Sequence, residues 1–393
     1  MTFSIDKSDW RKVRFGDVVS NVNEVVRDPS ALDIERSVGL EHLDPGELAV
    51  TRWAAIEEGT SFTRRVQSGQ TLFGKRRSYQ RKTAYATFNA ICSGDILVFY
   101  PKDPQVLLPE LLPFIASSDA FYNVALRTSA GSLSPRTRWS DLAAFEFLLP
   151  SLAEQQRIAD LLWAFEQHRQ SVRAVELRFS TAEMAWTERA VWDNPYPEQA
   201  LSDLLDSCNY GLSDRCVTDQ GDGCPAVLRI PNVVQGHCSF HDLRFLPEAA
   251  DSSHPAAIRE GDFLVVRTNG NPSYVGIGAL VEQMQETTLF ASYLLRLRTM
   301  TDRLLPSFLA LCWGTKKFNQ RLRPYVRSSA GNYNLSSSSI LGLSIPCPPL
   351  TEQLRVVAEF DKFTGARREI AANERALKES ATVVLEALLG GRS

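Results

Sequence analysis

Two stretches of the chain carry apolar residues at the alternating spacing of three and four positions that is typical of a coiled-coil helix. The first runs from Ser151 to about Trp192 without a glycine or proline, and the second runs from Thr351 to about Leu389 with Gly365 inside it. The spacing predicts two helices of about 40 residues, each about 60 Å long. Because neither helix can bury its apolar stripe alone, we expect them to pack together as an antiparallel pair. The predicted stripe positions are Ile158, Leu161, Phe165, Val172, Val175, Phe179, Ala182 and Trp186 in the first helix and Val356, Phe360, Phe363, Ile370, Leu377, Ala381, Val384 and Leu388 in the second.

The regions that precede these helices have a different pattern. Short apolar runs rich in β-branched and aromatic residues, such as 95–100 and 262–266, are separated by Gly, Pro, Asn and Ser, which predicts strands. Residues 107–117 and 306–320 are predicted helices, each with a proline near its first turn. The predicted fold class is therefore α+β, with two tandem α/β domains separated by two long helices that form an antiparallel coiled coil. The predicted boundaries are 1–150 for the first domain, 151–194 for the first spacer helix, 195–348 for the second domain and 349–393 for the second spacer helix.

The chain also resembles itself. Four landmarks occur in the same order in both halves, which predicts two tandem copies of one large unit rather than a solenoid of short repeats. The paired segments are 15–18 (FGDV) with 201–204 (LSDL), 94–98 (GDILV) with 261–265 (GDFLV), 127–131 (RTSAG) with 327–331 (RSSAG), and 150–155 (PSLAEQ) with 349–353 (PLTEQ).

Composition and charge narrow the function classes. Apolar residues make up 44% and charged residues 23% of the 393 positions, as in a globular protein. The net charge of −3 does not indicate a nucleic-acid binder, yet basic residues gather in groups, which suits a protein that grips phosphates with one face. An evenly solvated surface is the competing interpretation. No stretch approaches the length of a membrane span and the first residues lack the apolar core of a signal peptide, so we expect a cytoplasmic protein. The basic groups lie within 52–82, 127–138 and 321–327.

We expect no catalytic residues in this chain. Gly69-Gln-Thr-Leu-Phe-Gly-Lys75 matches most of the phosphate-binding pattern G-x-x-x-x-G-K, but Arg76 stands where that motif needs Ser or Thr to hold magnesium. We favour a turn that leads into a basic strand. Asp193-Asn-Pro-Tyr-Pro197 has the wrong order for the D/N-P-P-Y loop of amino-methylating DNA methyltransferases, and five scattered histidines support no Ser-His-Asp arrangement.

We also expect no metal site. Several cysteines lie near three histidines in the second half, and together they offer the ligand types of a zinc site. However, the C-x-x-C pair that structural zinc sites usually contain is absent, so free thiols are the interpretation we favour. These cysteines are Cys208, Cys216, Cys224 and Cys238.

The repeated P-x-L-x-E-Q segment that leads into each long helix resembles the conserved-region hallmark of type I restriction-modification specificity subunits. Residues 267–276 (RTNGNPSYVG) are similar to an R-T-N-x…V-G segment of their target-recognition domains, and residues 330–336 (AGNYNLS) resemble a G-x-x-N-[IL]-S segment. With the duplicated layout, the resemblance covers nearly the whole chain. The first half departs from it, because it carries 73–79 (FGKRRSY) and 131–136 (GSLSPR) in the corresponding places. We therefore expect two recognition domains of different subtypes that bind different sequences.

The resemblance implies that each target-recognition domain binds one half of a split double-stranded DNA site, while the two helices act as a spacer. Arg suits guanine, and Asn or Gln suits adenine in the major groove; some of these side chains will contact only phosphates. Turn formation by the Asn residues and a surface ion pair for Arg267 are the structural alternatives. The candidate DNA-binding residues are Lys75, Arg76, Arg77, Tyr79, Arg81, Arg136 and Arg138 in the first half and Tyr210, Arg267, Asn269, Asn271, Tyr274, Asn332 and Asn334 in the second.

The resemblance also implies that partners supply the chemistry. Two modification subunits, each an S-adenosylmethionine-dependent adenine methyltransferase, and restriction subunits would join this chain, so S-adenosylmethionine, ATP and magnesium belong to them and this chain needs no cofactor. A scaffold that no longer binds specific DNA, or a nuclease or ATPase built on the Lys75 loop, are the alternatives. The recognised bases and the spacer length are left open. The candidate docking residues on the helices are Glu154, Gln155, Arg157, Glu352, Gln353 and Arg355.

Overall fold

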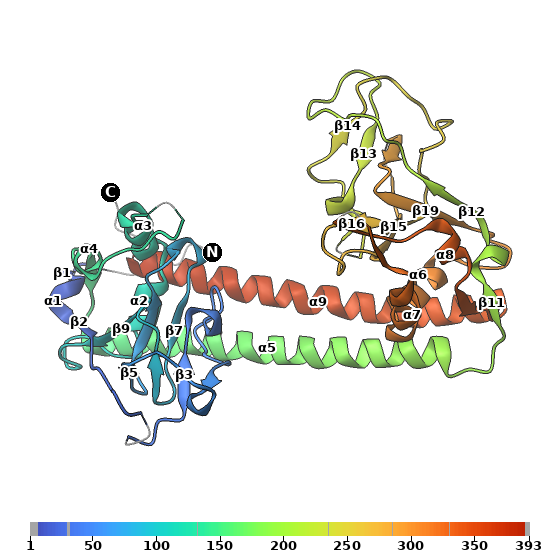
Figure 1. The fold of residues 1–393 in the computed structure, drawn as a ribbon. Helices are drawn as coiled ribbons and strands as arrows, with labels where there is room; N and C mark the ends of the chain where they lie inside the picture. The colour runs from blue at the N-terminus through green and yellow to red at the C-terminus, as the bar shows by residue number, and fades with distance from the viewer. Residues whose placement is uncertain are drawn as a thin grey trace. The chain divides into compact units, whose positions relative to one another are not determined.

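A computed structural model describes residues 7–29, 32–131, 133–234, 236–284, 286–329 and 331–389 of the chain. It divides into two compact units: unit 1 comprises 1–174 with 370–393, and unit 2 comprises 175–369. Both units contain sheets, short helices and one part of each long helix, α5 (Leu152–Trp192) and α9 (Leu350–Leu389) (Figure 1). This arrangement confirms the predicted α+β class with a long helix pair. The predicted domain boundaries stay a prediction, because the compact units share the helices between them.

In unit 1, a four-stranded sheet lies between a helical layer and a second sheet. Its strand β9 buries side chains on both faces: Leu97 and Phe99 pack among the helices, whereas Ile96 and Val98 pack toward the second sheet. Alternation with a period of two is what a strand buried on both faces requires. The first sheet has the order β2-β9-β6-β7 and the second has β4-β3-β8-β5, and β1 pairs with β10. The elements are β1 (Arg11–Arg14), α1 (Phe15–Val18), β2 (Val19–Val22), β3 (Arg36–Val38), η2 (Leu40–His42), β4 (Ala54–Ala55), η3 (Ile56–Glu58), β5 (Arg64–Val66), β6 (Thr71–Gly74), η4 (Ser78–Gln80), β7 (Thr83–Tyr85), β8 (Ala90–Cys92), β9 (Ile96–Pro101), α2 (Leu112–Ser117), α3 (Asp119–Thr128), α4 (Trp139–Ala143) and β10 (Glu146–Leu149).

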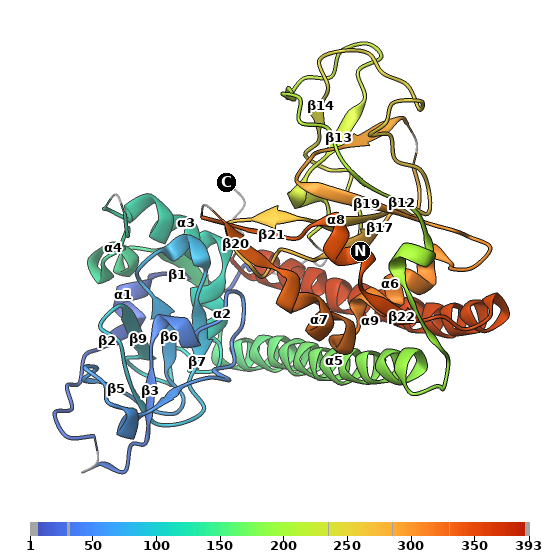
Figure 2. The same cartoon turned by 45° about the vertical axis from the view of Figure 1, so that its right-hand side comes forward.

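Unit 2 repeats this plan. Its central sheet has the order β12-β19-β15-β17, a second sheet has β14-β13-β18, and β11 pairs with β22. In both views β13 and β14 lie at the end of unit 2 that is farthest from its part of α9 (Figures 1 and 2). A further small sheet, β16-β21-β20, has no named counterpart in unit 1. The elements are β11 (Glu198–Ala200), η5 (Leu201–Asp203), β12 (Leu205–Tyr210), β13 (Ala226–Leu228), η6 (Ile230–Asn232), β14 (Arg244–Phe245), β15 (Phe263–Val266), β16 (Thr268–Asn269), β17 (Gly278–Leu280), β18 (Thr288–Phe290), β19 (Leu294–Thr299), α6 (Pro306–Gly314), α7 (Lys316–Leu322), η7 (Arg323–Tyr325), β20 (Arg327–Ser329), β21 (Asn332–Asn334), α8 (Ser337–Leu341) and β22 (Ser344–Pro346).

Numbering the central strands of each unit along the chain gives the same spatial order, first-fourth-second-third, in both. This topology corrects one predicted landmark. Segment 94–98 enters β9, the fourth strand, whereas 261–265 enters β15, the second strand, so the two are not equivalent. The true counterpart of 261–266 is 69–74. Segments 69–74 and 261–266 both begin with a glycine at positive φ, +91° at Gly69 and +87° at Gly261. Segments 94–98 and 261–265 resemble each other only because each contains a Gly-Asp turn.

Hydrogen bonds support this corrected alignment. The Gly69 N–H donates to Ala86 O over 2.8 Å, and the Gly261 N–H donates to Val281 O over 2.9 Å. One position later, the side chains of Gln70 and Asp262 each accept a backbone N–H from three residues earlier, over 2.8 Å in both cases. The two strands therefore start in the same way although their sequences share little.

A second landmark also changes meaning. Arg127 lies in the last turn of α3, whereas Arg327 begins strand β20, because η7 is inserted before it in unit 2. Two members of the compared motifs, Ser132 and Ala330, lie outside the described residues. The first and last landmarks do mark equivalent places. Phe15 donates its N–H to Phe145 O and Leu201 donates its N–H to Leu343 O, at 2.7 and 2.8 Å.

Within each unit the two long helices run antiparallel. In unit 1, Arg173 of α5 contacts Glu374 of α9, and Leu162 shares a core with Leu388. In unit 2, Phe179 and Trp186 of α5 both pack on Phe363 of α9, with ring centroids 5.6 and 5.2 Å apart. The predicted stripe needs correction at three positions, because Leu161 is 39% and Val175 is 53% exposed and Ala182 is exposed as well, while Leu162, next to Leu161, is buried.

The glutamine of each P-x-L-x-E-Q segment fastens the start of its helix to the sheet part of the same unit. Gln155 Nε2 donates to Val106 O and Pro150 O at 2.9 Å, and its Oε1 accepts the Leu108 N–H at 2.9 Å. Gln353 repeats the pattern with Arg303 O, Pro348 O and the Leu305 N–H, at 2.8 to 2.9 Å.

Both glutamines are buried, with exposed fractions of 1% and 0%. The prediction that Gln155 and Gln353 dock a partner is therefore wrong: every hydrogen bond of each amide goes to its own unit, which leaves no polar group of the amide for another chain. A buried side chain that satisfies one donor and two acceptors costs stability when it is removed.

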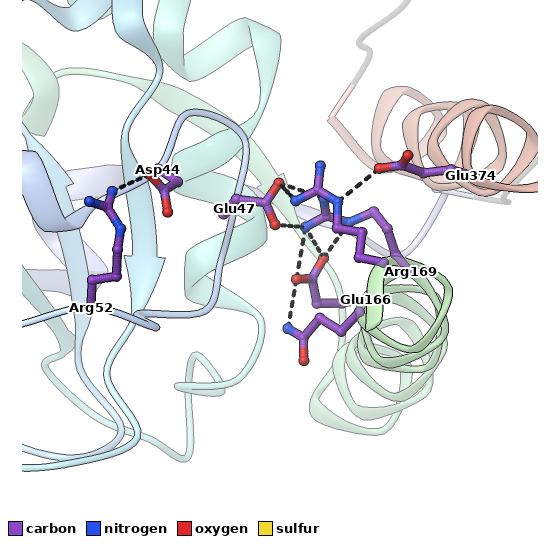
Figure 3. Close-up of polar contacts among 8 residues, drawn as sticks. Asp44, Glu47, Arg52, Glu166, Arg169 and Glu374 are labelled. Atoms are coloured by element: carbon purple, nitrogen blue, oxygen red, sulfur yellow. Dashed lines mark hydrogen bonds and ion pairs between the residues drawn. The ribbon is translucent and has the colours of Figure 1, made fainter. Parts of the chain in front are cut away.

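The sheet part of unit 1 meets α5 and α9 through a cluster of charged side chains (Figure 3). Arg169 donates to both carboxylate oxygens of Glu47, at 2.7 and 2.9 Å, and also to Glu166 at 2.8 Å. Arg173 pairs with Glu47 as well and donates to Glu374 of α9 at 2.8 Å. The side chains of Arg169 and Glu166 are only 12% and 8% exposed. We call these five residues the ionic hub.

Candidate nucleic-acid interface

In unit 2 the small sheet β16-β21-β20 brings two distant segments together (Figure 2). Thr268 and Arg327 both lie opposite Asn334, one on each side of the central strand. The R-T-N segment and the G-x-x-N segment thus form one surface, as a shared role would require. Strand β20 is exposed along its whole length, and Asn332 is exposed beside it.

Arg267 is held from two sides at the entrance to this sheet. Its guanidinium lies 4.8 Å from the centre of the Tyr210 ring and donates to Ser292 O at 3.2 Å. Tyr210 is 46% exposed, and its hydroxyl contacts the Ser337 hydroxyl at 3.1 Å. The structure therefore joins Arg267 and Tyr210 in a cation–π pair. No carboxylate pairs with Arg267 among the described residues, which argues against the surface ion pair considered for it.

The asparagines of the following loop form turns. Asn269 Oδ1 accepts the Asn271 N–H at 2.8 Å, and Asn271 Oδ1 accepts the N–H and hydroxyl of Ser273 at 3.0 and 2.8 Å. These contacts use the carbonyl oxygens only, so the amide NH₂ groups stay available as donors. Tyr274, which is 40% exposed, ends the same loop. Turn formation and a binding role are thus compatible at these positions.

Unit 1 brings its candidate residues together in a matching way. The N–H of Lys75 donates to Asp95 O and the N–H of Thr137 donates to Lys75 O, both at 3.0 Å. In unit 2, Arg267 makes the same two backbone contacts, with Tyr293 and Leu335. Lys75 and Arg267 are therefore structural counterparts. In place of the second and third strands of a small sheet, unit 1 has isolated bridges that join Arg76, Ala130 and Arg136.

Three of the basic candidates in unit 1 are occupied by carboxylates. Asp95 accepts hydrogen bonds from Arg136 at 2.8 Å and from Arg76 at 3.4 Å, and the bond from Arg136 is the main cause of its lowered pKa. Arg81 pairs with Asp119 and lies over the ring of Tyr122, 4.8 Å from its centre. These three guanidinium groups are partly neutralised in the free protein.

Lys75 lies in the same basic surroundings. Burial and the nearby Arg64 lower the pKa of its ammonium group, against the opposing effect of Asp95. No ion pair of Lys75 is present in the described part of the chain. The ammonium group of Lys75 is therefore available to pair with an anion such as a phosphate.

Two exposed candidate side chains of unit 1, those of Arg77 and Tyr79, stand on a strained loop. Arg77 and Arg81 have left-handed backbones, with φ of 55° and 53°, and flank the one-turn helix η4. Its middle residue Tyr79 is 58% exposed, and the Arg77 N–H fixes the loop by donating to Pro135 O at 2.7 Å. Within the described residues, the guanidinium groups of Arg77 and Arg138 have no hydrogen-bond or ion-pair partner, so both are free to bind.

The resemblance of 69–75 to a phosphate-binding loop is misleading. A phosphate-binding loop offers free backbone N–H groups. Here Thr71 to Gly74 form β6, a buried strand that is paired with β7 on one side and β9 on the other. The ATPase alternative therefore loses the loop on which it rests.

The candidate set missed one residue that the structure places in the centre of the surface. Arg327 lies opposite Asn334 in β20, is exposed, and has no side-chain partner in the described part of unit 2. The sequence showed it only as a member of a basic group. Of that group, Arg321 pairs with Glu198 and Arg323 donates to Pro272 O, so these two have structural roles.

Metal and membrane chemistry find no support in the described residues. They contain no group of three or more His, Cys, Asp or Glu side chains placed to hold a metal ion, and the cysteines are free. Burial raises the pKa of the Cys208 thiol to about 11 and that of Cys238 to about 12, which keeps both protonated near neutral pH. None of the helices described is long and apolar enough to cross a bilayer.

Comparisons with known proteins agree with this geometry. Residues 7–176 match the model of the type I restriction modification DNA specificity domain. The EcoKI specificity subunit of Escherichia coli (strain K12), a type I restriction enzyme component, is 25% identical over 318 residues, which cover 76% of this chain and 66% of that protein, just under two thirds. Residues 7–176 thus resemble this specificity domain, and the chain is similar to type I specificity subunits over three quarters of its length.

Solved structures of this family share the fold. A chain from a structure described as the basis of complex assembly and conformational transition of the type I R-M system is 21% identical, with a TM-score of 0.61 over 97% of this chain and 98% of that one. The type I restriction-modification system S subunit from M. genitalium is 11% identical, with a TM-score of 0.55 over 100% of this chain and 99% of that one. The predicted resemblance to type I specificity subunits is confirmed, whereas the individual site residues stay a prediction.

Proposed function

We propose that this chain is the DNA-specificity subunit of a type I restriction-modification complex, with each unit binding one half of a bipartite site. The observation that carries the proposal is the duplicated surface: in both units, a strand end and a distant return segment place hydrogen-bonding side chains side by side. A duplex that contacts both surfaces would be recognised at two places and spanned between them.

The two surfaces differ in chemistry, which favours two different half-sites. In unit 2, Asn332 and Asn334 lie on β21 next to the exposed strand β20, and a two-stranded antiparallel ribbon fits the major groove. Asparagine amides suit adenine and a free arginine such as Arg327 suits guanine. In unit 1 the surface is mainly cationic, and we assign base contacts to Lys75 and Tyr79.

Several candidate residues have a different task in this proposal. Arg77 and Arg138 are unpaired and exposed, so we assign them to phosphates, which position the duplex without specifying sequence. Arg76, Arg81 and Arg136 are held by carboxylates, and they would support the loop rather than bind DNA first. Asn269 and Asn271 would present amide donors from turns that are already formed.

Partners would supply the chemistry, since we assign no catalysis to this chain. We propose that two methyltransferase subunits dock on the helices, that restriction subunits join them, and that S-adenosylmethionine, ATP and magnesium bind to these partners. The docking residues that remain candidates are the exposed ion pairs Glu154–Arg157 and Glu352–Arg355. Exposed apolar side chains on the same helices are further candidates for docking. They are Leu161, Val175, Leu177, Met184, Leu354 and Val383.

Co-expression with the methyltransferase subunit, followed by sequencing of methyladenine positions in host DNA, tests the proposal. We expect a split motif with an unread centre that depends on this chain. A stable complex that methylates without sequence preference would reject DNA recognition and favour a scaffold.

Variants then assign the half-sites. Asn332→Ala with Asn334→Ala should relax bases in one half of the motif only, at about 1–3 kcal/mol per lost bidentate contact. Arg77→Ala should weaken binding to all sequences and reduce its salt dependence. Ser252→Ala, at an exposed position of unit 2 outside the sheet β16-β21-β20, serves as the control. Relaxation of both halves by the Asn variants would contradict the assignment of one unit to one half-site.

A further inference from the structure

The junction between the sheet part and the helices is filled differently in the two units. In unit 1 the Trp163 indole packs between Tyr85 and Phe114, with ring centroids 5.2 and 5.1 Å away, and donates its N–H to Glu110 O at 2.9 Å. This aromatic trio closes the corner between β7, α2 and α5.

The equivalent positions of unit 2 can be identified one by one. Asp361 follows Gln353 by eight residues, as Trp163 follows Gln155, and both helices are uninterrupted there. Leu280 lies opposite the first residue of β15, as Tyr85 lies opposite the first residue of β6. Leu311 stands four residues before the capping residue Thr315, as Phe114 stands four before Ser118.

These three smaller side chains line a cleft of about 480 Å³ in unit 2, which we call the notch. Its apolar wall includes Trp313 and Phe360. Trp313 is fixed by its N–H, which donates to Gly276 O at 2.8 Å, and by the ring of Phe263 at 5.2 Å. Gly278 leaves space for both rings, since a Cβ there would come within 2.4 Å of Phe263 and 3.1 Å of Trp313. The notch is therefore preformed and rigid.

The rim of the notch carries an uneven charge. Asp361 and Glu282 are exposed and have no ion-pair partner in the described part of unit 2, against the single guanidinium of Arg368. An apolar recess with two unpaired carboxylates complements an aromatic group that has a basic neighbour.

We propose that the notch takes an aromatic side chain of a partner protein, flanked by a basic residue, and that this partner is the methyltransferase subunit. The chain itself supplies the precedent, because an indole fills the same corner of unit 1. The notch also lies on the same helix as the exposed pair Glu352–Arg355, one to two turns further along α9. The partner would thus anchor on unit 2 by a contact that unit 1 cannot offer. This inference rests on the proposed assembly with a methyltransferase subunit.

Filling the notch is the direct test. Calorimetry of the full chain with the methyltransferase subunit would compare Asp361→Trp with Lys362→Trp, which adds the same ring one position away, outside the notch lining. We expect Asp361→Trp to raise the dissociation constant about tenfold or more, with an unchanged or raised melting temperature. Lys362→Trp should change the dissociation constant by less than about twofold. Asp361→Leu, a smaller filler, should weaken binding less.

Hydrogen exchange provides a local readout. We expect the amides of 276–282 to become protected when the wild-type complex forms, and to gain no protection with Asp361→Trp. Equal binding by both proteins, without protection at 276–282, would overturn the inference and leave the notch as loose packing. A small molecule that co-purifies in native mass spectrometry and is lost in Asp361→Trp, with unchanged subunit affinity, would overturn it in favour of a small ligand. No binding by the wild-type chain would instead reject the proposed assembly.

Discussion

Units 1 and 2 share a strand order and a glutamine that fastens each long helix, yet they hold their helices by different forces. Unit 1 uses the ionic hub and an aromatic trio around Trp163, whereas unit 2 packs Phe179 and Trp186 on Phe363 between the helices and leaves a notch beside Asp361. The features that the two units share, the strand order and the helix-start glutamine, are those that set the chain topology. The contacts between the sheet part and the helices have diverged. Substitutions at these contacts should therefore affect the stability of the two units differently.

The difference has an energetic side. Removing one partner from a desolvated ion cluster leaves other charges buried without compensation, which costs more than the pair contributes. An apolar junction loses only packing and transfer energy. Unit 1 should therefore be the more sensitive of the two to single substitutions at its junction.

The largest effect is expected from Arg169→Met. This change leaves the buried Glu166 without an arginine and leaves Glu47 with Arg173 alone, so unit 1 should lose about 3–5 kcal/mol of stability. Hydrogen exchange of unit 1 amides in the intact chain would measure it, because a protein of two units need not unfold in one step. Arg367→Met is the matched variant of unit 2, where the guanidinium is 51% exposed and pairs with one carboxylate among the described residues, that of Glu183, which is 6% exposed. Its effect should be smaller, about 1–2 kcal/mol, because one carboxylate instead of two loses an arginine. Equal losses would show that the hub is no more sensitive than a single pair.

Trp163→Asp should have the next largest effect. The substitution gives unit 1 the residue that unit 2 has at the equivalent position, Asp361. The loss of the ring contacts and of the bond to Glu110 O should destabilise unit 1 by about 3 kcal/mol. Exchange protection of residues 83–85 and 112–117 would fall. Added indole should restore part of it if a cavity forms, as apolar cavities accept matching rings. A variant as stable as the wild type would mean that the trio does not hold the junction.

The glutamines test what the two units share. Gln155→Leu and Gln353→Leu each leave one buried N–H and two carbonyl groups without partners, and we expect each to cost about 2 kcal/mol in its own unit. Here the effects should be alike, in contrast to the first two predictions. Gln156→Leu, at an exposed position beside the first site, is the control. A large effect in only one unit would break the equivalence drawn from the hydrogen bonds.

The smallest effect concerns pH. The pKa of Asp95 is lowered in the folded protein, chiefly by Arg136, so its contribution is present above the pKa of the unfolded carboxyl, near 4, and is lost as the pH falls through the lower folded value. Asp95→Asn should therefore be slightly less stable than the wild type at pH 7, and the difference should be smaller at about pH 3. Denaturation curves at both pH values would show this. A difference that grows toward low pH would contradict the assigned ion pairs.

Local patterns predicted the features that local forces decide. The spacing of apolar residues gave both long helices, because burial of one stripe dictates it, and the repeated P-x-L-x-E-Q segments marked equivalent helix starts. The same motif led to a wrong role for Gln155 and Gln353, since no pattern tells whether a polar side chain at a helix start turns inward. The segments 94–98 and 261–265 look alike because both contain a Gly-Asp turn, and only strand pairing shows that they differ.

The candidate site shows the same limit. The motif resemblance named candidate residues in both 267–276 and 330–336, but only strand pairing shows that the two segments share one small sheet. The resemblance could not show that Asp95 occupies Arg76 and Arg136, because these three residues lie on separate segments. Arg327 was missed as a site residue for the same reason: its importance comes from its register opposite Asn334.

The loop around Tyr79 combines two charged side chains with strained backbone conformations. Arg77 and Arg81 hold backbone angles that glycine adopts freely and that cost other residues about 1 kcal/mol or more each. A selection for heat resistance alone would replace them with glycine and would lose a free cation at one position and a ring-stacked one at the other. A chain that keeps arginine at both places gives up thermal robustness for a stiff, charged loop, so the most stable variants of this protein should be among its poorest binders.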